Sequence, residues 1–513
     1  YEEEQFVGYR YFDSFQNKNG GQFDQNRNSA AFLFGHGLSY TKFSLSASAK
    51  WTDGALSVTS EVRNVGECAG KESVLVYVGS PRGRLKKPVR TFAGFEKTKL
   101  LAPGEKEMLT IEIPAKDFAV YDDKAHFFVL EAGEYFIFAG GAVDEAEKIG
   151  SFTLAQDEIV EKTCSVLAPV EEVKGISADG SVSERTELVP RCGVFPVRAA
   201  YQKPAFAELP GHRGARILFS DLKVHPEKLD DFVSQFSLKE LVDFTVCNGS
   251  CFGPKQSGAA GKLAHSKKYG IPTYYMSDGN SSVNLNRRTT GFPSSNVLAG
   301  TFNKQLAYMV GEVLAKESKE YGIAINLGPG GNLHRNLLCG RHPEYFSEDP
   351  ILTGTLMAYQ ARGQEENGVR ATYKHFLANG SELERKSSHS IMNERTLREL
   401  YLRVFDKAFS LYKPSCVMTS YNAVNGIYPS ECAPLLHDLL RKCWGFDGFV
   451  MTDWGACDTA DAVRSVNAGT NLLTPGDKKL FKKIHSAAKR GEISKGTLQN
   501  SVKQIIKVLL QCE

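Results

Sequence analysis

The sequence has no long apolar run, no block of like charge and no regular cysteine spacing. No apolar stretch approaches the roughly 20 residues that a membrane-spanning helix needs, which argues against a membrane partner. The 62 lysines and arginines nearly balance the 59 aspartates and glutamates, so the formal net charge is only +3. With no dense basic run, nucleic acid is a poor candidate as a partner, and the charge balance favours an uncharged one.

The cysteines, 11 in number, are scattered without the rhythm of a disulfide scaffold. Such use favours free thiols in a reducing compartment, so we expect a cytoplasmic location. Cys247 and Cys251 are the closest pair, but no second pair or neighbouring histidine at ligand spacing completes a zinc site. We therefore predict no metal and no cofactor.

The early part of the chain has the pattern of β-strands. Between about residues 43 and 154, apolar residues recur at every second position, and turn signals such as Asp53-Gly54 separate the runs. The runs include Val58, Val76, Ile111 and Ile137. Short alternating strands with turns between them predict a fibronectin-III-like β-sandwich over residues 41–155.

The rest of the 513-residue chain divides into an irregular stretch and a long α/β region. Residues 156–235 lose periodicity while prolines recur, which predicts an irregular connector. From 236 to 513, amphipathic helices alternate with apolar strands, so we predict a TIM-type (β/α)8-like barrel. A doubly wound open sheet is the competing architecture, but no Gly-x-Gly-x-x-Gly follows a strand to support it.

Residues able to do chemistry stand at, or just after, the carboxyl ends of the predicted strands. In a parallel barrel these ends open on one face, so residues distant in sequence converge on one pocket. The sequence therefore predicts an enzyme. The residues in question are Asp278, Arg341, Lys374, His375, Tyr421, Asp453 and Trp454.

Asp453 has the strongest claim to a catalytic role. Its carboxylate can act as a base, a metal ligand or a nucleophile, and glycosidases use such a group to form a covalent glycosyl intermediate. Trp454 beside it offers a flat apolar wall of the kind that packs on the C–H face of a sugar ring. The alternative is an aspartate that merely caps the next helix.

Lys374, His375 and Tyr421 also have structural alternatives. Neighbouring strand residues point to opposite faces unless the strand ends or bulges, in which case Lys374 and His375 both line the rim. Otherwise they are a buried ion-paired lysine and a structural histidine. Tyr421 aims its phenol at Asp453 or is a core aromatic with a bonded hydroxyl.

Several motifs together resemble glycoside hydrolase family 3, whose best-known members are β-glucosidases. The resemblance covers most of the predicted barrel and also the segments 8–13 and 34–40, which are similar to the link between the family's α/β sandwich and fibronectin-like domains. The matching barrel stretches are Leu327-Gly328-Pro329-Gly330, Cys339-Gly340-Arg341, Glu344 through Pro350, Lys374-His375-Phe376, Asn393 through Glu399, Ser420-Tyr421-Asn422 and Thr452-Asp453-Trp454-Gly455.

The resemblance implies a retaining exo-β-glycosidase, above all a β-glucosidase, acting on oligosaccharides or glycosides. It implies that Asp453 is the nucleophile, Tyr421 steadies it, Met418 lines the pocket and Trp454 stacks on the substrate. It also implies a set of residues that hydrogen-bond the sugar hydroxyls, namely Asp278, Arg341, Lys374, His375 and Arg385.

The chain departs from the family pattern in three ways. The fibronectin-like domain precedes the barrel, as in circularly permuted members. The arginine that usually follows Asp278 is absent, and we expect Arg287 or Arg288 to replace it. Finally, most members take the acid/base carboxylate from the α/β sandwich domain, of which residues 1–40 resemble only the C-terminal remnant, so the motifs identify no proton donor.

Two other functions stay open. The first is a catalytically incomplete carbohydrate-binding barrel that needs a second chain carrying the α/β sandwich domain and its acid. The second is a β-N-acetylglucosaminidase, because one subgroup of the family places a histidine acid/base after the Lys-His motif within an Asp-Ser-His run. Residues 385–390 contain His389 but no aspartate.

Overall fold

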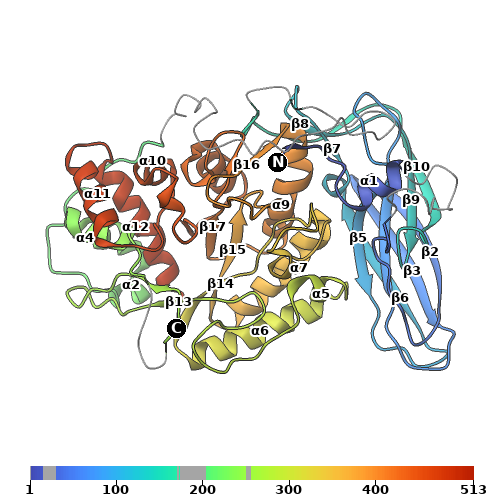
Figure 1. Cartoon of the computed structure of the whole chain (residues 1–513), viewed down its shortest axis with the longest axis horizontal. Helices are drawn as coiled ribbons and strands as arrows, with labels where there is room; N and C mark the ends of the chain where they lie inside the picture. Colours follow the sequence, from blue (N-terminus) through green and yellow to red (C-terminus); the bar gives the residue numbers. More distant parts are fainter. Residues whose placement is uncertain (1, 16–29, 170–172, 174–203, 250–255, 513) are drawn as a thin grey trace.

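A computed structural model describes residues 2–15, 30–169, 173, 204–249 and 256–512. The chain is multidomain, with a β-rich lobe, blue to cyan in Figure 1, beside a larger lobe of helices and short strands. Cys251 lies outside the described residues, as do residues 170–172 and 174–203 of the predicted connector. No helix in the part that the structure describes is both long and apolar enough to cross a bilayer.

The β-rich lobe contains a three-stranded and a four-stranded antiparallel sheet. Buried residues alternate with exposed ones along β3 and β6, and the buried faces meet in one apolar cluster that includes Val58, Val76 and Ile137. This matches the alternation expected of a sandwich. The strands are β2 (Phe43–Thr52), β3 (Ala55–Asn64), β6 (Lys106–Pro114), and β10 (Glu147–Leu154), β9 (Gly133–Gly140), β4 (Ser73–Gly79), β5 (Thr91–Lys97).

The larger lobe is built on a six-stranded sheet whose strands run parallel except for the first. Single bridges extend it: Met451 pairs with Leu472, Leu473 with Val246, and Asn248 with Lys262 of the first strand. Two short segments therefore link the last strand back to the first. In sheet order the strands are β12 (Gly261–Lys262), β13 (Tyr275–Asp278), β14 (Ile323–Leu327), β15 (Arg370–Phe376), β17 (Cys416–Thr419) and β19 (Phe449–Met451).

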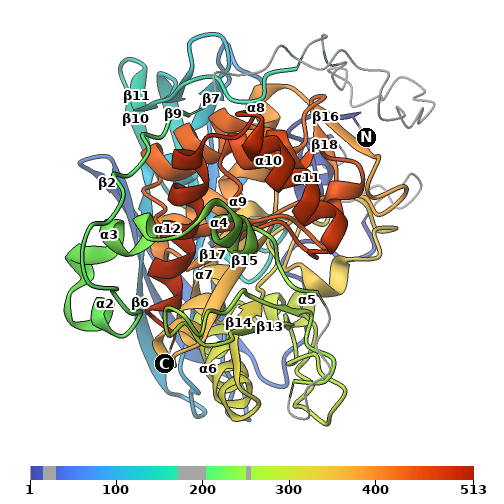
Figure 2. The same ribbon diagram turned by 90° about the vertical axis from the view of Figure 1, so that its left-hand side faces the viewer.

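Helices alternate with these strands along the chain, as the sequence predicts (Figure 2). α7 begins where the buried Asp349 side chain accepts hydrogen bonds from the backbone N–H groups of Ile351 and Leu352, an N-cap. The main helices are α4 (Leu238–Thr245), α5 (Ser295–Ala299), α6 (Lys304–Glu320), α7 (Pro350–Glu366), α8 (Glu394–Thr396), η4 (Leu397–Tyr401), α9 (Leu402–Leu411), η6 (Pro434–Cys443), α10 (Ala462–Ala468), α11 (Lys478–Lys489) and α12 (Lys495–Leu509).

The range predicted to be an irregular connector contains regular elements where it is described. β11 (Glu158–Lys162) pairs with β8 (Phe127–Leu130), which pairs with β7 (Val120–Asp122). α2 (Asp221–Val224) and α3 (Leu229–Ser234) follow further along. Each of these elements is too short to show a clear period in the sequence.

The N-terminal segment joins the two lobes. β1 (Glu2–Glu3) pairs with β16 (His389–Met392), which in turn pairs with β18 (Ala423–Val424). The Tyr9 hydroxyl in α1 (Tyr9–Phe15) donates to Asp349 Oδ2 over 3.0 Å and accepts from the Phe92 N–H of β5 over 2.8 Å. One phenol thus bonds both lobes.

Candidate functional site

The structure brings the predicted site residues to one end of the parallel sheet. Asp278 is the last residue of β13, and Lys374 and His375 lie in β15. Tyr421 and Asp453 each lie two residues beyond a strand, after β17 and β19. Contacts between these residues, given below, show that the strand ends converge as the sequence predicts.

Asp453 is buried, with only 5% of its surface exposed. One oxygen, Oδ1, accepts the backbone N–H of Trp454 over 2.6 Å, and Oδ2 lies 3.5 Å from Nε2 of His375. Burial raises the pKa of Asp453 to about 6, although the cations Arg341 and Lys374 oppose that rise. A carboxylate with these surroundings is ionised near neutral pH and poorly solvated.

His375 lies between Asp453 and Arg341. The Tyr345 hydroxyl and Arg341 Nη1 each lie 3.0 Å from its Nδ1. Burial lowers the pKa of His375 well below its usual value, and the nearby Arg341 and Lys374 lower it further. The imidazole is therefore neutral and acts through hydrogen bonds rather than charge.

Lys374 and the adjacent His375 both reach the site. They can do so because the pairing register of β15 with β17 shifts between Tyr373 and Phe376. Its ammonium, almost fully buried, lies 3.2 Å from Asp278 Oδ1 and 3.3 Å from Glu344 Oε1. The register shift is the bulge that the sequence argument requires for both side chains to reach the rim.

Two carboxylates that the sequence analysis left without a role complete the cluster. Glu344 Oε2 lies 3.4 Å from Arg341 Nη1. Glu382 Oε2 lies 3.2 Å from Arg341 Nε and 3.0 Å from Arg385 Nε. The sequence carries a signal for both, because each glutamate stands three residues from an arginine that it contacts.

The three remaining predicted site residues are not part of this charged cluster; they are Tyr421, Trp454 and Met418. The Tyr421 hydroxyl donates to the carbonyl of Trp454 over 2.6 Å, and the Arg385 guanidinium lies 4.3 Å from the centre of its ring. Glycine at position 261 leaves room for the Trp454 indole, since a Cβ there would lie 2.9 Å from Cζ2. Met418 is buried in the apolar core beneath the site.

Arg287 does not lie where the sequence analysis expects a replacement arginine. Its guanidinium packs over the ring of Tyr321, whose hydroxyl donates to the backbone carbonyl of Arg288. Tyr321 stands two residues before β14 begins, at the end of the sheet opposite to Asp278. The expectation for Arg287 is therefore wrong, because its loop has already returned to the other end of the sheet.

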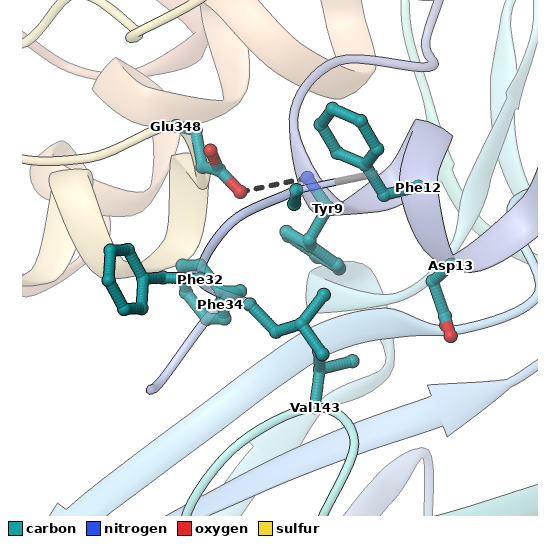
Figure 3. A pocket seen from close by; sticks show the side chains of 9 residues that line it. Tyr9, Phe12, Asp13, Phe32, Phe34, Val143 and Glu348 are labelled. Atoms are coloured by element: carbon teal, nitrogen blue, oxygen red, sulfur yellow. Dashed lines mark hydrogen bonds between the residues drawn. The ribbon is translucent and has the colours of Figure 1, made fainter. Parts of the chain in front are cut away.

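A separate pocket lies at α1, between the lobes (Figure 3). Its walls are mostly apolar, and the one glutamate in them, Glu348, accepts the backbone N–H of Tyr9 over 2.8 Å. Among the residues that the structure covers, no group of three or more histidine, cysteine, aspartate or glutamate side chains is arranged to hold a metal ion. The cluster around Asp453 is therefore the candidate site.

Comparisons with known proteins identify the family of this chain. The family model described as the glycosyl hydrolase family 3 N-terminal domain matches residues 256–508. A β-glucosidase of Ruminococcus albus is 37% identical to this chain over 99% of its length. This chain belongs to glycoside hydrolase family 3. The predicted family is thereby confirmed, and a fibronectin type III-like model matches residues 72–143.

Other relatives of this family 3 chain are also longer than it is. The chain covers 55% of the R. albus protein and 65% of β-glucosidase A of Butyrivibrio fibrisolvens, to which it is 32% identical. A solved β-glucosidase from Paenibacillus barengoltzii superposes with a TM-score of 0.86 at 32% identity, over the whole of this chain and 58% of the other. The chain thus spans about half to two thirds of these relatives.

Proposed function

We propose that this chain carries the nucleophile and sugar-binding site of a retaining exo-β-glycosidase that removes terminal non-reducing β-D-glucosyl residues. The observation that carries the proposal is the buried Asp453 carboxylate, ionised near neutral pH and held beside neutral His375 and the cations Arg341 and Lys374. The relatives named β-glucosidases support glucose as the sugar.

In the first step, an Asp453 oxygen bonds to the anomeric carbon while the bond to the leaving oxygen breaks and its electron pair goes to that oxygen. Water then attacks the anomeric carbon of the glycosyl ester, the bond from that carbon to Asp453 breaks and its electron pair restores the carboxylate, and the proton lost by the water passes to the solvent. Tyr421 holds the backbone beside the nucleophile, Trp454 stacks on the sugar, and Met418 supports the pocket floor. The hydroxyl-binding residues are Asp278, Arg341, Lys374, His375 and Arg385.

We also propose that the parallel sheet of the larger lobe closes into a barrel. The bridges that link β19 back to β12 through Leu472 and Val246 support a closed (β/α)8-like barrel over residues 236–513. The proposed domains before the barrel are a remnant of an α/β sandwich domain over residues 1–40, a fibronectin-III-like sandwich over 41–155 and a connector over 156–235. The nine described cysteines are free thiols, which favours a cytoplasmic location.

Protonation of the leaving oxygen needs a second group. Retaining enzymes need a second carboxyl about 5–5.5 Å from the first. Within the described cluster, Asp278, Glu344 and Glu382 are each engaged in an ion pair with a lysine or arginine. Although burial opposes them, the cations Lys374 and Arg341 hold the pKa of Glu344 below its usual value, which makes it a poor acid. Burial raises the pKa of Glu382, but its carboxylate is held between Arg341 and Arg385. A dinitrophenolate leaving group needs little protonation, whereas the sugar alkoxide released from cellobiose needs much.

We therefore predict that this polypeptide cleaves 2,4-dinitrophenyl β-glucoside but cleaves cellobiose far more slowly than relatives with a complete site. The expected deficit is the roughly 10²–10⁴-fold that general acid catalysis supplies. Initial rates on both substrates test this. Full activity on cellobiose would show that an acid within this chain was overlooked.

The pairing of those three carboxylates also keeps the second candidate function open. In this second function the barrel binds the sugar, but it hydrolyses the glycoside only when another chain supplies the acid. Binding of glucose with no turnover of either substrate is its signature. His389 gives little support to an N-acetylglucosaminidase, because it is buried within β16 rather than free on a loop.

A further inference from the structure

Six side chains of alternating charge form a continuous chain around the candidate site. In order they are Asp278, Lys374, Glu344, Arg341, Glu382 and Arg385, and successive partners lie 3.2, 3.3, 3.4, 3.2 and 3.0 Å apart. They come from four parts of the sheet end: β13, the loop after β14, β15 and the loop after β15. The family motifs assign a sugar-binding role to four of them and none to Glu344 or Glu382.

From this arrangement we infer that Glu344 and Glu382 are positioning residues, each shared by two cations that bind the sugar. Glu344 contacts Lys374 and Arg341, and its Oε1 also accepts from Asn280 Nδ2 over 2.9 Å. Glu382 contacts Arg341 and Arg385. Arg341 is therefore held from both sides. The inference rests on the function proposed above.

The physical advantage is preorganisation. Lysine and arginine side chains have many rotamers, and a sugar that had to order three of them would lose binding free energy. Here the carboxylates fix the cations before a ligand arrives, and positioning of this kind contributes strongly to reaction rate. Partial burial strengthens the attraction between these carboxylates and the cations, since Glu344 and Glu382 keep only 31% and 21% of their side-chain surface exposed.

The same pairing balances the charge of the site. The six members are three carboxylates and three cations, so the chain of charges is neutral as a whole. Asp453 then supplies the dominant unbalanced charge next to the reacting carbon, where positive charge develops in the transition state. A neutral sugar gains directed hydrogen bonds from such a site without an excess cation that would favour anions.

The test uses covalent labelling, which needs no acid catalyst. A 2-deoxy-2-fluoro-β-glucoside with a dinitrophenolate leaving group is incubated with the full chain, and intact mass spectrometry follows the labelled fraction over time and pH. The variants are Glu382→Ala, Glu382→Gln and the same pair at Glu344. Glu384→Gln is the matched control, an exposed glutamate on the same loop as Glu382.

We expect each alanine variant to label roughly 10- to 100-fold more slowly than the wild type, because the shared cations lose their support. Each glutamine variant keeps an oxygen for Arg341 but loses the charge, so it should recover most of the rate. Asp453 is faced by His375, Arg341, Lys374 and Tyr421. When the positive charge of Arg341 is less fully neutralised, it favours the ionised form of Asp453 more strongly. The pH at which labelling reaches half its maximum should therefore move lower.

The outcomes separate this inference from the proposed function. If the wild type and the control label but the alanine variants label equally fast, the positioning role is refuted and the proposed function stands. If the losses follow only the unfolding midpoint of each variant and the pH profile stays fixed, the two residues are merely structural and the inference fails. An unlabelled wild type would overturn the proposed function and this inference together.

Discussion

At the scale of single residues, Asp453 shows how burial creates reactivity at a cost in stability. Its pKa of about 6 in the folded protein lies above the roughly 3.9 of an exposed aspartate. The native state therefore holds this proton more tightly than the unfolded chain does. Stability contributed by the protonated form is present at low pH and is lost as the pH rises from about 4 to about 6.

Asp453→Asn should remove this pH-dependent penalty while it abolishes covalent labelling. A pKa difference of about two corresponds to roughly 3 kcal/mol, so the Asn variant should gain on the order of 1–3 kcal/mol relative to the wild type between pH 4 and pH 7. Denaturant unfolding at both pH values measures the gain. Asp53→Asn, in the exposed turn between β2 and β3, is the control for loss of a carboxylate at the surface. A relative gain at Asp453 that fails to grow with pH would contradict the burial argument.

At the scale of secondary structure elements, hydrophobic patterning predicted most of the framework. β14, β15, β17 and β19 are strands in the region where strands alternating with helices were predicted, because each is a largely buried run. β12 has only two residues and no period, so nothing in the local sequence marked it. Glu344 and Glu382 were missed for a different reason: their partners include cations on other loops, and only the fold brings those together.

The helix α1 was predicted only as part of a domain remnant, yet it connects the two lobes. Tyr9 of this helix bonds to both lobes. The buried Asp13 of the same helix also accepts hydrogen bonds from Arg90 Nε and Nη2 at 2.9 and 2.6 Å. Arg90 precedes β5 of the sandwich, whereas Asp349 caps α7 of the larger lobe. Contacts of this kind order a segment whose own seven residues are too few for a stable helix.

Tyr9→Phe should therefore weaken the junction without changing its shape. The variant removes a donor to Asp349 and leaves the buried Phe92 N–H without its acceptor, at a cost of about 1–3 kcal/mol. Thermal and denaturant midpoints should both fall. Tyr40→Phe removes a hydroxyl from a fully exposed ring and serves as the control. Equal midpoints for the two variants would show that the bonds of Tyr9 do not stabilise the junction.

At the scale of the whole molecule, the sandwich packs on the helices of the larger lobe. The Tyr121 N–H of β7 donates to Glu399 of η4 over 2.8 Å, and Lys407 of α9 pairs with Asp117 over 2.6 Å. Lys304 of α6 pairs with Glu96 of β5 over 2.7 Å. α6 and α9 flank the parallel sheet (Figure 1), so the sandwich supports that sheet from outside while the strand ends carry the candidate site.

Whether that site forms a bond to sugar is the central question. The most direct measurement is peptide mapping of the chain after reaction with the 2-deoxy-2-fluoro-β-glucoside used above, because the fluorine slows breakdown of the glycosyl ester more than its formation when the leaving group is good. The account predicts a single sugar adduct on Asp453, and none in the Asp453→Asn variant. An adduct on another carboxylate, such as Asp278 or Glu382, or no adduct at all, would contradict it.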